Sequence, residues 1–460
     1  MRVLLVQSHL GRKKHEHAPI FPIGLCYIAT ALIEKYDVKI FDLNLWELPI
    51  AFEKLKEEII NFSPDVVGIS IRNIDTTSRI DPFCYFKTIK PTAELIKKIS
   101  PRIKLIVGGA GFSLFAQKIM ERIPEFDFGI YLEGEESVVE LLDYMDSPET
   151  VKGIFIRRKD SVTFTGFREP PNFANLPIPI RNKGVMNIKE YIGPMESNIG
   201  IQTKRGCILK CAYCNYPFLS GNRLRLRSPK DVVDEIEYII SLGIRSFSFV
   251  DNIFNIPKSH AKEICEEIIK RDLKIEWSAW FEIKNTTEDL ILLAKEAGCK
   301  HFGFSPDALS NKALSFLNKG ITTDDIKNNI NIFRRTAGVR AGYNFFLMLP
   351  GMNFIDVLKT VFMYLKMPIL LFGKGGGVMV GWIRIEPHTE IHKKAIENSI
   401  VKEDTELFPE NETELKKLFY CKPSYKLLDL SIIYLIRFLD NYVKPIAKFS
   451  TKGSYKLERQ

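Results

Sequence analysis

Three cysteines within eight residues carry the clearest chemical meaning in this sequence. Cys207, Cys211 and Cys214 have the spacing C-x3-C-x2-C. Four cysteines ligate all four irons of a [4Fe–4S] cluster, so three would leave one iron open to accept a substrate or cofactor. Zinc is the alternative. Structural zinc sites usually add a second C-x2-C pair or histidines, but the next cysteine, Cys265, lies in a helical pattern. The spacing therefore favours an iron–sulfur cluster over zinc.

The segment that must position the cysteines alternates apolar strands with helical patterns. Strands are expected at 199–203, 246–250, 275–281, 301–305, 340–349 and 378–385. Ser228 is expected to cap a helix that has Pro229 in its first turn. Six such repeats support a barrel over residues 196–400, with its functional residues at the carboxyl ends of the strands.

Residues 1–150 also alternate strands and helices, which predicts a doubly wound, Rossmann-like parallel sheet. Ligands of such sheets bind at the carboxyl ends of the strands. Here those ends are small residues, namely Ser70, Gly108, Gly109 and Gly134. Small residues let a large planar or phosphate-bearing ligand approach the backbone. Tight strand-to-helix turns explain the same glycines, and both interpretations stay open.

Composition sets the limits for the rest of the chain. The 460 residues suggest about three domains, and 45% apolar with 26% charged residues exclude a disordered chain, a collagen and a coiled coil. The net charge is +9, with a basic tail at 444–459. No apolar stretch reaches the roughly 18 residues that a membrane span needs, and no secretory signal is recognisable. We therefore expect a cytoplasmic protein, in which the eight cysteines form no disulfide framework.

The remaining segments are a linker and an extension. Prolines at 170, 171, 177 and 179 indicate a linker over residues 151–195. Residues 401–460 are expected to be mainly helical. They could cap the open barrel, shape a substrate pocket or dock on a membrane as a peripheral contact, and capping is the interpretation we favour. No pattern typical of nucleic-acid binding is present.

Two groups of motifs resemble the radical S-adenosylmethionine (SAM) enzymes that carry a cobalamin-binding domain, the class B radical SAM methylases. DVVGIS, IVGG and LEGEES follow one another as in the cobalamin-binding domain, and Arg205-Gly206 precedes the cysteine triad. The resemblance implies a partial (β/α)6 TIM-type barrel, a [4Fe–4S] cluster on the three cysteines, SAM on the open iron, and cobalamin. The Asp-x-His-x-x-Gly motif of corrinoid carriers is absent, so we expect no histidine ligand to cobalt.

The resemblance also implies roles for individual residues. The expected SAM-binding residues are Tyr213 near the adenine, Asp251 at the amino group, Glu282 at the end of the third barrel strand, and Ser305 (or Asp307) near the ribose. The expected cobalamin-binding residues are Ser70, Gly108, Gly109, Gly134 and Glu135, with Arg72 and Asn73 facing the lower side of the corrin. His388 is a candidate for the substrate site or for a packed loop residue.

Three functions follow from this resemblance and its alternatives. The first is transfer of a methyl group from methylcobalamin to an unactivated carbon, after hydrogen abstraction by a 5′-deoxyadenosyl radical. The second uses the same cofactors for oxidative cyclisation, ring contraction or carbon–carbon coupling. The third is a non-catalytic corrinoid- or zinc-binding module. An electron donor such as ferredoxin or flavodoxin is expected. The substrate, a small molecule or a peptide, is not identified by the sequence.

Overall fold

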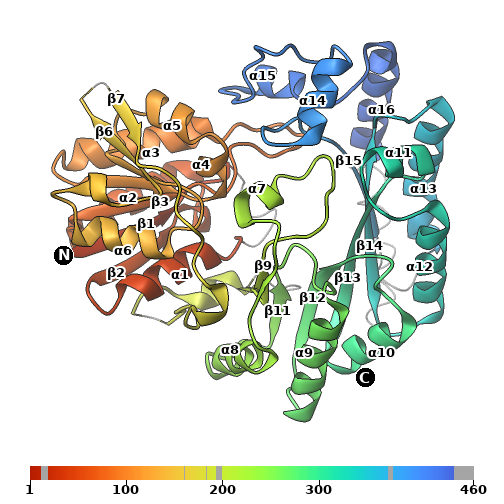
Figure 1. Cartoon of the computed structure of the whole chain (residues 1–460), viewed down its shortest axis with the longest axis horizontal. Helices are drawn as coiled ribbons and strands as arrows, with labels where there is room; N and C mark the ends of the chain where they lie inside the picture. Colours follow the sequence, from red (N-terminus) through yellow and green to blue (C-terminus); the bar gives the residue numbers. More distant parts are fainter. Residues whose placement is uncertain (12–18, 160, 183, 193–198, 371–376, 440–460) are drawn as a thin grey trace.

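The computed structural model describes residues 1–11, 19–159, 161–182, 184–192, 199–370 and 377–439. Two α/β parts lie next to each other, and helices from the end of the chain lie above the gap between them (Figure 1). The basic tail at 444–459 lies outside the described residues. Among the described helices, none combines the length and the apolar character needed to cross a membrane.

The N-terminal part is a seven-stranded sheet in the order β2-β1-β3-β4-β5-β6-β7. The first five strands are parallel. Strand β1 leaves only its first residue exposed, as expected for a strand covered on both faces. The predicted doubly wound sheet is confirmed. Its parallel strands are β1 (Arg2–Gln7), β2 (Asp37–Asp42), β3 (Val66–Ser70), β4 (Lys104–Gly108) and β5 (Phe128–Ile130), and its helices are α1 (Ile23–Leu32), α2 (Leu48–Phe62), α3 (Phe86–Ile99), α4 (Ala110–Leu114), α5 (Ala116–Arg122) and α6 (Glu135–Asp143).

This sheet continues past residue 150, where the linker was predicted to begin. Strands β6 (Ile154–Arg158) and β7 (Ser161–Phe164) add to it as an antiparallel pair. The rings of Phe155 and Phe164 stack with centroids 4.8 Å apart, and both contact Tyr131 after β5. This aromatic packing holds the pair to the sheet, so the first part of the predicted linker belongs to the N-terminal domain.

The second part is a six-stranded parallel sheet in the order β15-β14-β13-β12-β11-β8. It does not close on itself, so it forms the predicted partial barrel. Ser228 accepts a hydrogen bond from Asp231 N and caps α8, as predicted, with Pro229 in the first turn. The strands are β8 (Gly200–Ile201), β11 (Ser246–Phe249), β12 (Glu276–Phe281), β13 (Cys299–Asp307), β14 (Arg340–Leu347) and β15 (Gly377–Trp382), and the helices are α8 (Pro229–Ser241), α9 (Lys258–Lys270), α10 (Glu288–Glu296), α11 (Asn311–Phe316), α12 (Thr323–Arg335) and α13 (Phe354–Leu370).

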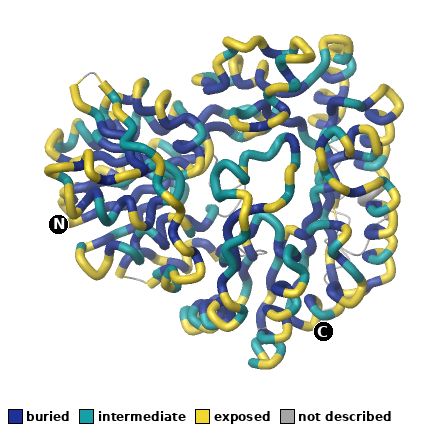
Figure 2. The backbone as a smooth tube through the Cα atoms, viewed as in Figure 1, coloured by how far each residue is buried: buried dark blue, intermediate teal, exposed yellow. Residues whose placement is uncertain are grey.

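The last helices, α14 (Glu390–Glu397), α15 (Glu412–Lys417) and α16 (Lys426–Phe438), tie the edge of the barrel to the N-terminal domain. Asp429 of α16 is fully buried and accepts hydrogen bonds from Trp382 Nε1 at 2.5 Å and from Arg79 Nε at 2.9 Å. Arg384, just after β15, pairs with Asp75 at 3.2 Å. Figure 2 shows the dark, buried backbone running through both sheets. These contacts join the loop after β3 to α16 and to the end of β15.

Candidate active site

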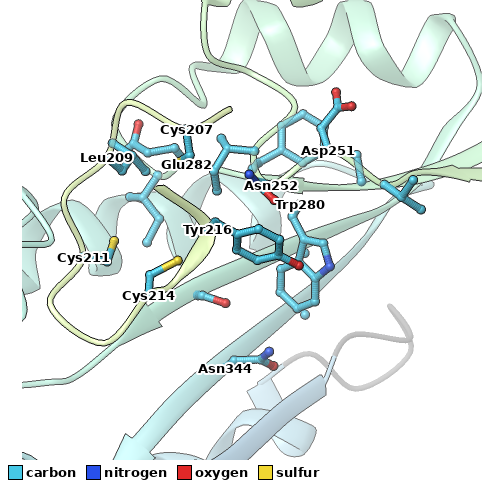
Figure 3. Close-up of a pocket in the computed structure, with 18 of the residues that line it drawn as sticks. Cys207, Leu209, Cys211, Cys214, Tyr216, Asp251, Asn252, Trp280, Glu282 and Asn344 are labelled. Atoms are coloured by element: carbon cyan, nitrogen blue, oxygen red, sulfur yellow. The ribbon is translucent and has the colours of Figure 1, made fainter. Parts of the chain in front are cut away.

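A cavity of about 960 Å³ lies at the carboxyl ends of the barrel strands, where functional residues were expected. The three cysteines line it together with residues from β11, β12 and β13. Figure 3 shows Cys211 and Cys214 beside Tyr216, with Trp280 and Asn344 farther along the wall. The predicted SAM residues Tyr213, Asp251, Glu282 and Ser305 also line the cavity. The fold therefore brings the cysteine triad and all four of these residues to one place.

The loop that carries the cysteines is closed at its base. Strands β9 (Lys204–Arg205) and β10 (Arg225–Leu226) pair antiparallel on either side of it. Gly206 begins the loop with φ +89°, and a Cβ there would lie 2.0 Å from the carbonyl oxygen of Arg223. Only glycine fits such a position. This requirement explains the Arg-Gly pair that precedes the first cysteine.

The three thiols share one nearby positive charge. Burial is the main influence and raises the pKa of each thiol, that of Cys214 to about 12. The ammonium of Lys319 acts in the opposite direction and lowers the pKa of all three. Lys319 lies on the loop between α11 and α12 and also lines the cavity.

Tyr213, expected near the adenine, is anchored through its hydroxyl group. The hydroxyl donates to Asp307 Oδ2 at 2.7 Å, and Lys319 Nζ pairs with the same oxygen at 2.7 Å. Asp307 is fully buried, and burial raises the pKa of its carboxyl group. Tyr213 therefore lines the cavity while its hydroxyl group is held by a buried carboxylate.

Asp251 holds the strand that leads to the cysteines. One carboxylate oxygen accepts from Thr203 N at 2.7 Å, and the other from Thr203 Oγ1 at 2.5 Å. Lys204 Nζ lies 3.4 Å from the second oxygen. Both oxygens are thus engaged by protein groups, which makes Asp251 a positioning residue of the loop. Its predicted bond to the SAM amino group stays a prediction.

Glu282 is engaged in the same way. Its carboxylate accepts from the backbone nitrogens of Lys284 at 2.9 Å and Asn285 at 2.8 Å, so it caps the turn after β12. Ser305 lines the cavity where β13 changes register, between Phe304 and Asp307. Asp251 and Glu282 thus have their carboxylates engaged by protein groups, and Tyr213 has its hydroxyl group engaged by Asp307.

A second, smaller hollow of about 260 Å³ lies at the carboxyl ends of the N-terminal strands. Ser70, Gly108, Gly109, Gly134 and Glu135 line it, all of which were predicted for cobalamin. Gly109 has φ +100°, and a Cβ there would lie 2.5 Å from the carbonyl oxygen of Ile71. The glycines therefore let the loop after β3 cross the sheet edge closely.

That loop carries Arg72 and Asn73, and the structure separates them. Arg72 lines the larger cavity although it belongs to the N-terminal domain. Asn73 is exposed and lines neither of the two cavities, while its backbone lies against Gly111, where a Cβ would approach to 2.9 Å. Arg72 thus lies between the two domains, whereas Asn73 does not reach the wall of the larger cavity.

Glu135 is paired across the domain boundary, which the sequence did not indicate. Arg205, next to the cysteine loop, contacts Glu135 at 2.6 Å and Glu133 at 2.8 Å. Arg225 of β10 donates to Glu133 as well, at 2.9 Å. The second oxygen of Glu135 is buried and has no hydrogen-bond partner among the described residues. These ion pairs join the hollow of the N-terminal domain to the base of the cysteine loop.

Tyr216 lines both cavities, and it was also missed. It begins α7 (Tyr216–Ser220), two residues after Cys214. Its position directly after the cysteine motif was the only available signal. His388, in contrast, is exposed and stacks on Phe218 with ring centroids 3.7 Å apart, and it does not line the larger cavity.

The residues present fit the cofactors that the resemblance implied. Three cysteines face one deep cavity, and a glycine-lined hollow adjoins it. Among the described residues, no group of three or more His, Cys, Asp or Glu side chains converges as ligands of a single metal ion would. The set fits a cluster with one unligated iron, which needs thiolates spread around a cube.

A partial barrel with a cysteine-lined cavity, joined to a parallel sheet with a glycine-lined hollow, defines an α/β enzyme with two cofactor regions. The chain matches the radical SAM superfamily over residues 201–363 and the B12 binding domain over residues 17–142. It therefore belongs to the cobalamin-dependent radical SAM enzymes. The enzymes of this family use a [4Fe–4S] cluster, SAM and cobalamin, so the family assignment confirms the cofactors predicted from the sequence.

The similar proteins include methyltransferases and a cyclase. An uncharacterized methyltransferase of Pyrococcus horikoshii is 27% identical over 78% of this chain and 77% of its own length. The anaerobic magnesium-protoporphyrin IX monomethyl ester cyclase of Rubrivivax gelatinosus is 25% identical over 73% of this chain and 60% of its own. The radical SAM methyltransferase TsrM of Kitasatospora setae, solved with cobalamin and a [4Fe-4S] cluster, superposes with a TM-score of 0.73 at 23% identity, over 86% of this chain and 78% of that one.

Proposed function

We propose that this enzyme transfers a methyl group from methylcobalamin to an unactivated carbon after hydrogen abstraction by a 5′-deoxyadenosyl radical. The observation that carries the proposal is that Tyr216 forms part of the wall of both cavities. A methyl donor in the glycine-lined hollow and a substrate radical in the cysteine-lined cavity would thus be neighbours. When bound, the cluster with SAM supplies the radical, and cobalamin supplies the methyl group.

The protein's own residues hold this arrangement in place. Arg205 and Arg225 bind Glu133 across the domain boundary, and Arg384 binds Asp75 on the loop after β3. Fixed geometry matters because group transfer between two sites requires a near-attack arrangement of the reacting atoms. Asp251, Glu282 and Lys319 are engaged by protein groups, and Arg72 adds a positive charge to the wall from the N-terminal domain. An uncharged reacting group of the substrate suits the apolar and aromatic wall.

The test uses protein purified without oxygen from cells supplied with cobalamin, given reductant and SAM labelled with deuterium in its methyl group. We expect about four irons per chain, bound corrinoid that gains the labelled methyl group, S-adenosylhomocysteine and 5′-deoxyadenosine. Label that never reaches the corrinoid, with 5′-deoxyadenosine still formed, would contradict methyl transfer while leaving the radical chemistry intact.

Oxidative cyclisation is the second candidate, because the Rubrivivax gelatinosus relative is a cyclase. The two reactions differ in product mass. Methylation adds one CH2 unit to the substrate, whereas oxidative cyclisation removes two hydrogens. Once a substrate is found, mass spectrometry of the product with labelled SAM distinguishes them directly.

A further inference from the structure

The ammonium group of Lys319 is buried against the cysteine loop. Its side chain is 11% exposed and pairs with Asp307 Oδ2 at 2.7 Å. It lines the same cavity as the three cysteines. Its backbone is fixed to the same place, because Ala212 N, next to Cys211, donates to Leu317 O at 3.0 Å. Lys319 is therefore held beside the cysteine loop.

This arrangement is costly for stability alone. A buried ion pair rarely gains more in attraction than it loses in desolvation. Asp307 adds to the cost, because its Oδ1 is buried without a hydrogen-bond partner among the described residues and its φ is +73°. Apolar residues of similar volume would pack as well. This cost indicates a role for the pair at the cysteine loop.

We propose that Lys319 is a positioning residue that raises the reduction potential of the cluster by holding a positive charge beside the cysteine triad. Net charge and hydrogen bonds to the sulfurs set the potentials of iron–sulfur clusters. A cluster on thiolates gains negative charge when it is reduced, so a nearby cation favours the reduced state. The inference rests on the proposed function only in requiring the cluster.

Tyr213 and Asp307 hold this charge in place. Tyr213 OH and Lys319 Nζ each lie 2.7 Å from Asp307 Oδ2, and Lys319 Nζ lies 5.8 Å from the centre of the Tyr213 ring. Lys319 lines the cavity together with the three cysteines, whereas the buried Asp307 does not line it.

The test is a potentiometric titration of the cluster, followed by electron paramagnetic resonance, in the cobalamin-loaded enzyme. In Lys319→Met we expect iron content like the wild type and at least a tenfold lower ratio of reduced to oxidised cluster at a fixed potential, which is a 59 mV shift for one electron. Lys319→Arg should restore most of the ratio. Lys312→Met, which removes an exposed lysine from α11, is the matched control and should change nothing.

Asp307→Asn gives a test of opposite sign. Removal of the compensating carboxylate should raise the ratio of reduced to oxidised cluster, and this variant decides the question if Lys319→Met fails to hold iron. Unchanged titrations in Lys319→Met or in Asp307→Asn would overturn the inference. Because the readout is the cluster itself, the result does not depend on whether methyl transfer occurs.

Discussion

The two cofactor regions of this enzyme are built in different ways. The cysteine site is local, since its three ligands lie on one loop within eight residues. The hollow of the N-terminal domain is assembled from the ends of several strands and contributes mostly backbone and small residues, such as Ser70, Gly108 and Gly134. Side-chain chemistry therefore defines one region, and close backbone approach defines the other.

The comparison predicts that binding of the cluster and binding of the corrinoid can be lost separately. Replacement of one ligand, Cys214→Ala, should abolish cluster assembly, with iron falling from about four per chain to near zero and all 5′-deoxyadenosine formation lost. Corrinoid should stay bound, because none of the cysteines lines the N-terminal hollow. Iron, sulfide and corrinoid analysis of the purified variant checks this, and Cys421→Ala, outside the triad, is the control. Joint loss of iron and corrinoid would show that the regions are not independent.

Replacement of Arg205 is expected to affect both cofactor regions at once. Arg205→Met leaves Glu133 and Glu135 partly unpaired in a buried place, and breaking a buried ion pair costs about 3–5 kcal/mol. We expect a clearly lower midpoint of thermal unfolding and weaker retention of both iron and corrinoid. Arg158→Met disrupts the exposed pair with Glu149 and should have little effect. An Arg205→Met protein that unfolds like Arg158→Met would contradict the coupling role.

Gly109 tests the backbone-built region. In Gly109→Ala the new Cβ meets the Ile71 carbonyl oxygen at 2.5 Å with φ at +100°. Gly166→Ala is matched in φ, at +98°, but meets nothing within 4 Å. Strained backbone alone costs of the order of 1–3 kcal/mol, so Gly109→Ala should lose more stability than Gly166→Ala. It should also lose corrinoid while keeping iron. Equal effects of the two variants would show that close approach is unimportant.

The smallest expected effect concerns Glu386, just beyond β15. Burial raises the pKa of its carboxyl group from 4.5 to about 7, and Asn215 Nδ2 donates to it at 2.5 Å. The folded state therefore favours the protonated form, so the free energy of unfolding should fall as pH rises from about 4.5 to about 7. Because the group is partly exposed, we expect no more than about 2 kcal/mol. Thermal unfolding of Glu386→Gln and wild type at pH 5 and pH 8 measures the difference. The gain of the variant should appear only at pH 8.

Local patterns were enough for much of the fold. Periodic apolar residues marked the strands, and Ser228-Pro229 marked the start of α8, because caps and strand faces depend on near neighbours in the chain. The antiparallel pair β6 and β7 was missed for a different reason. Its place in the sheet depends on aromatic contacts with Tyr131, which lies more than twenty residues earlier.

The sequence by itself determined the cysteine triad, the alternation of strands and helices, and the family resemblance, since these are properties of short segments. Only the tertiary structure decided how Asp251, Glu282 and Glu135 use their carboxylates, because their partners come from other loops or from the other domain. The same holds for Tyr216, which lines both cavities, and for Lys319, which lines the cavity of the cysteines. A charged or aromatic side chain acquires its role from its neighbours in space, and burial strengthens the electrostatic interactions between them.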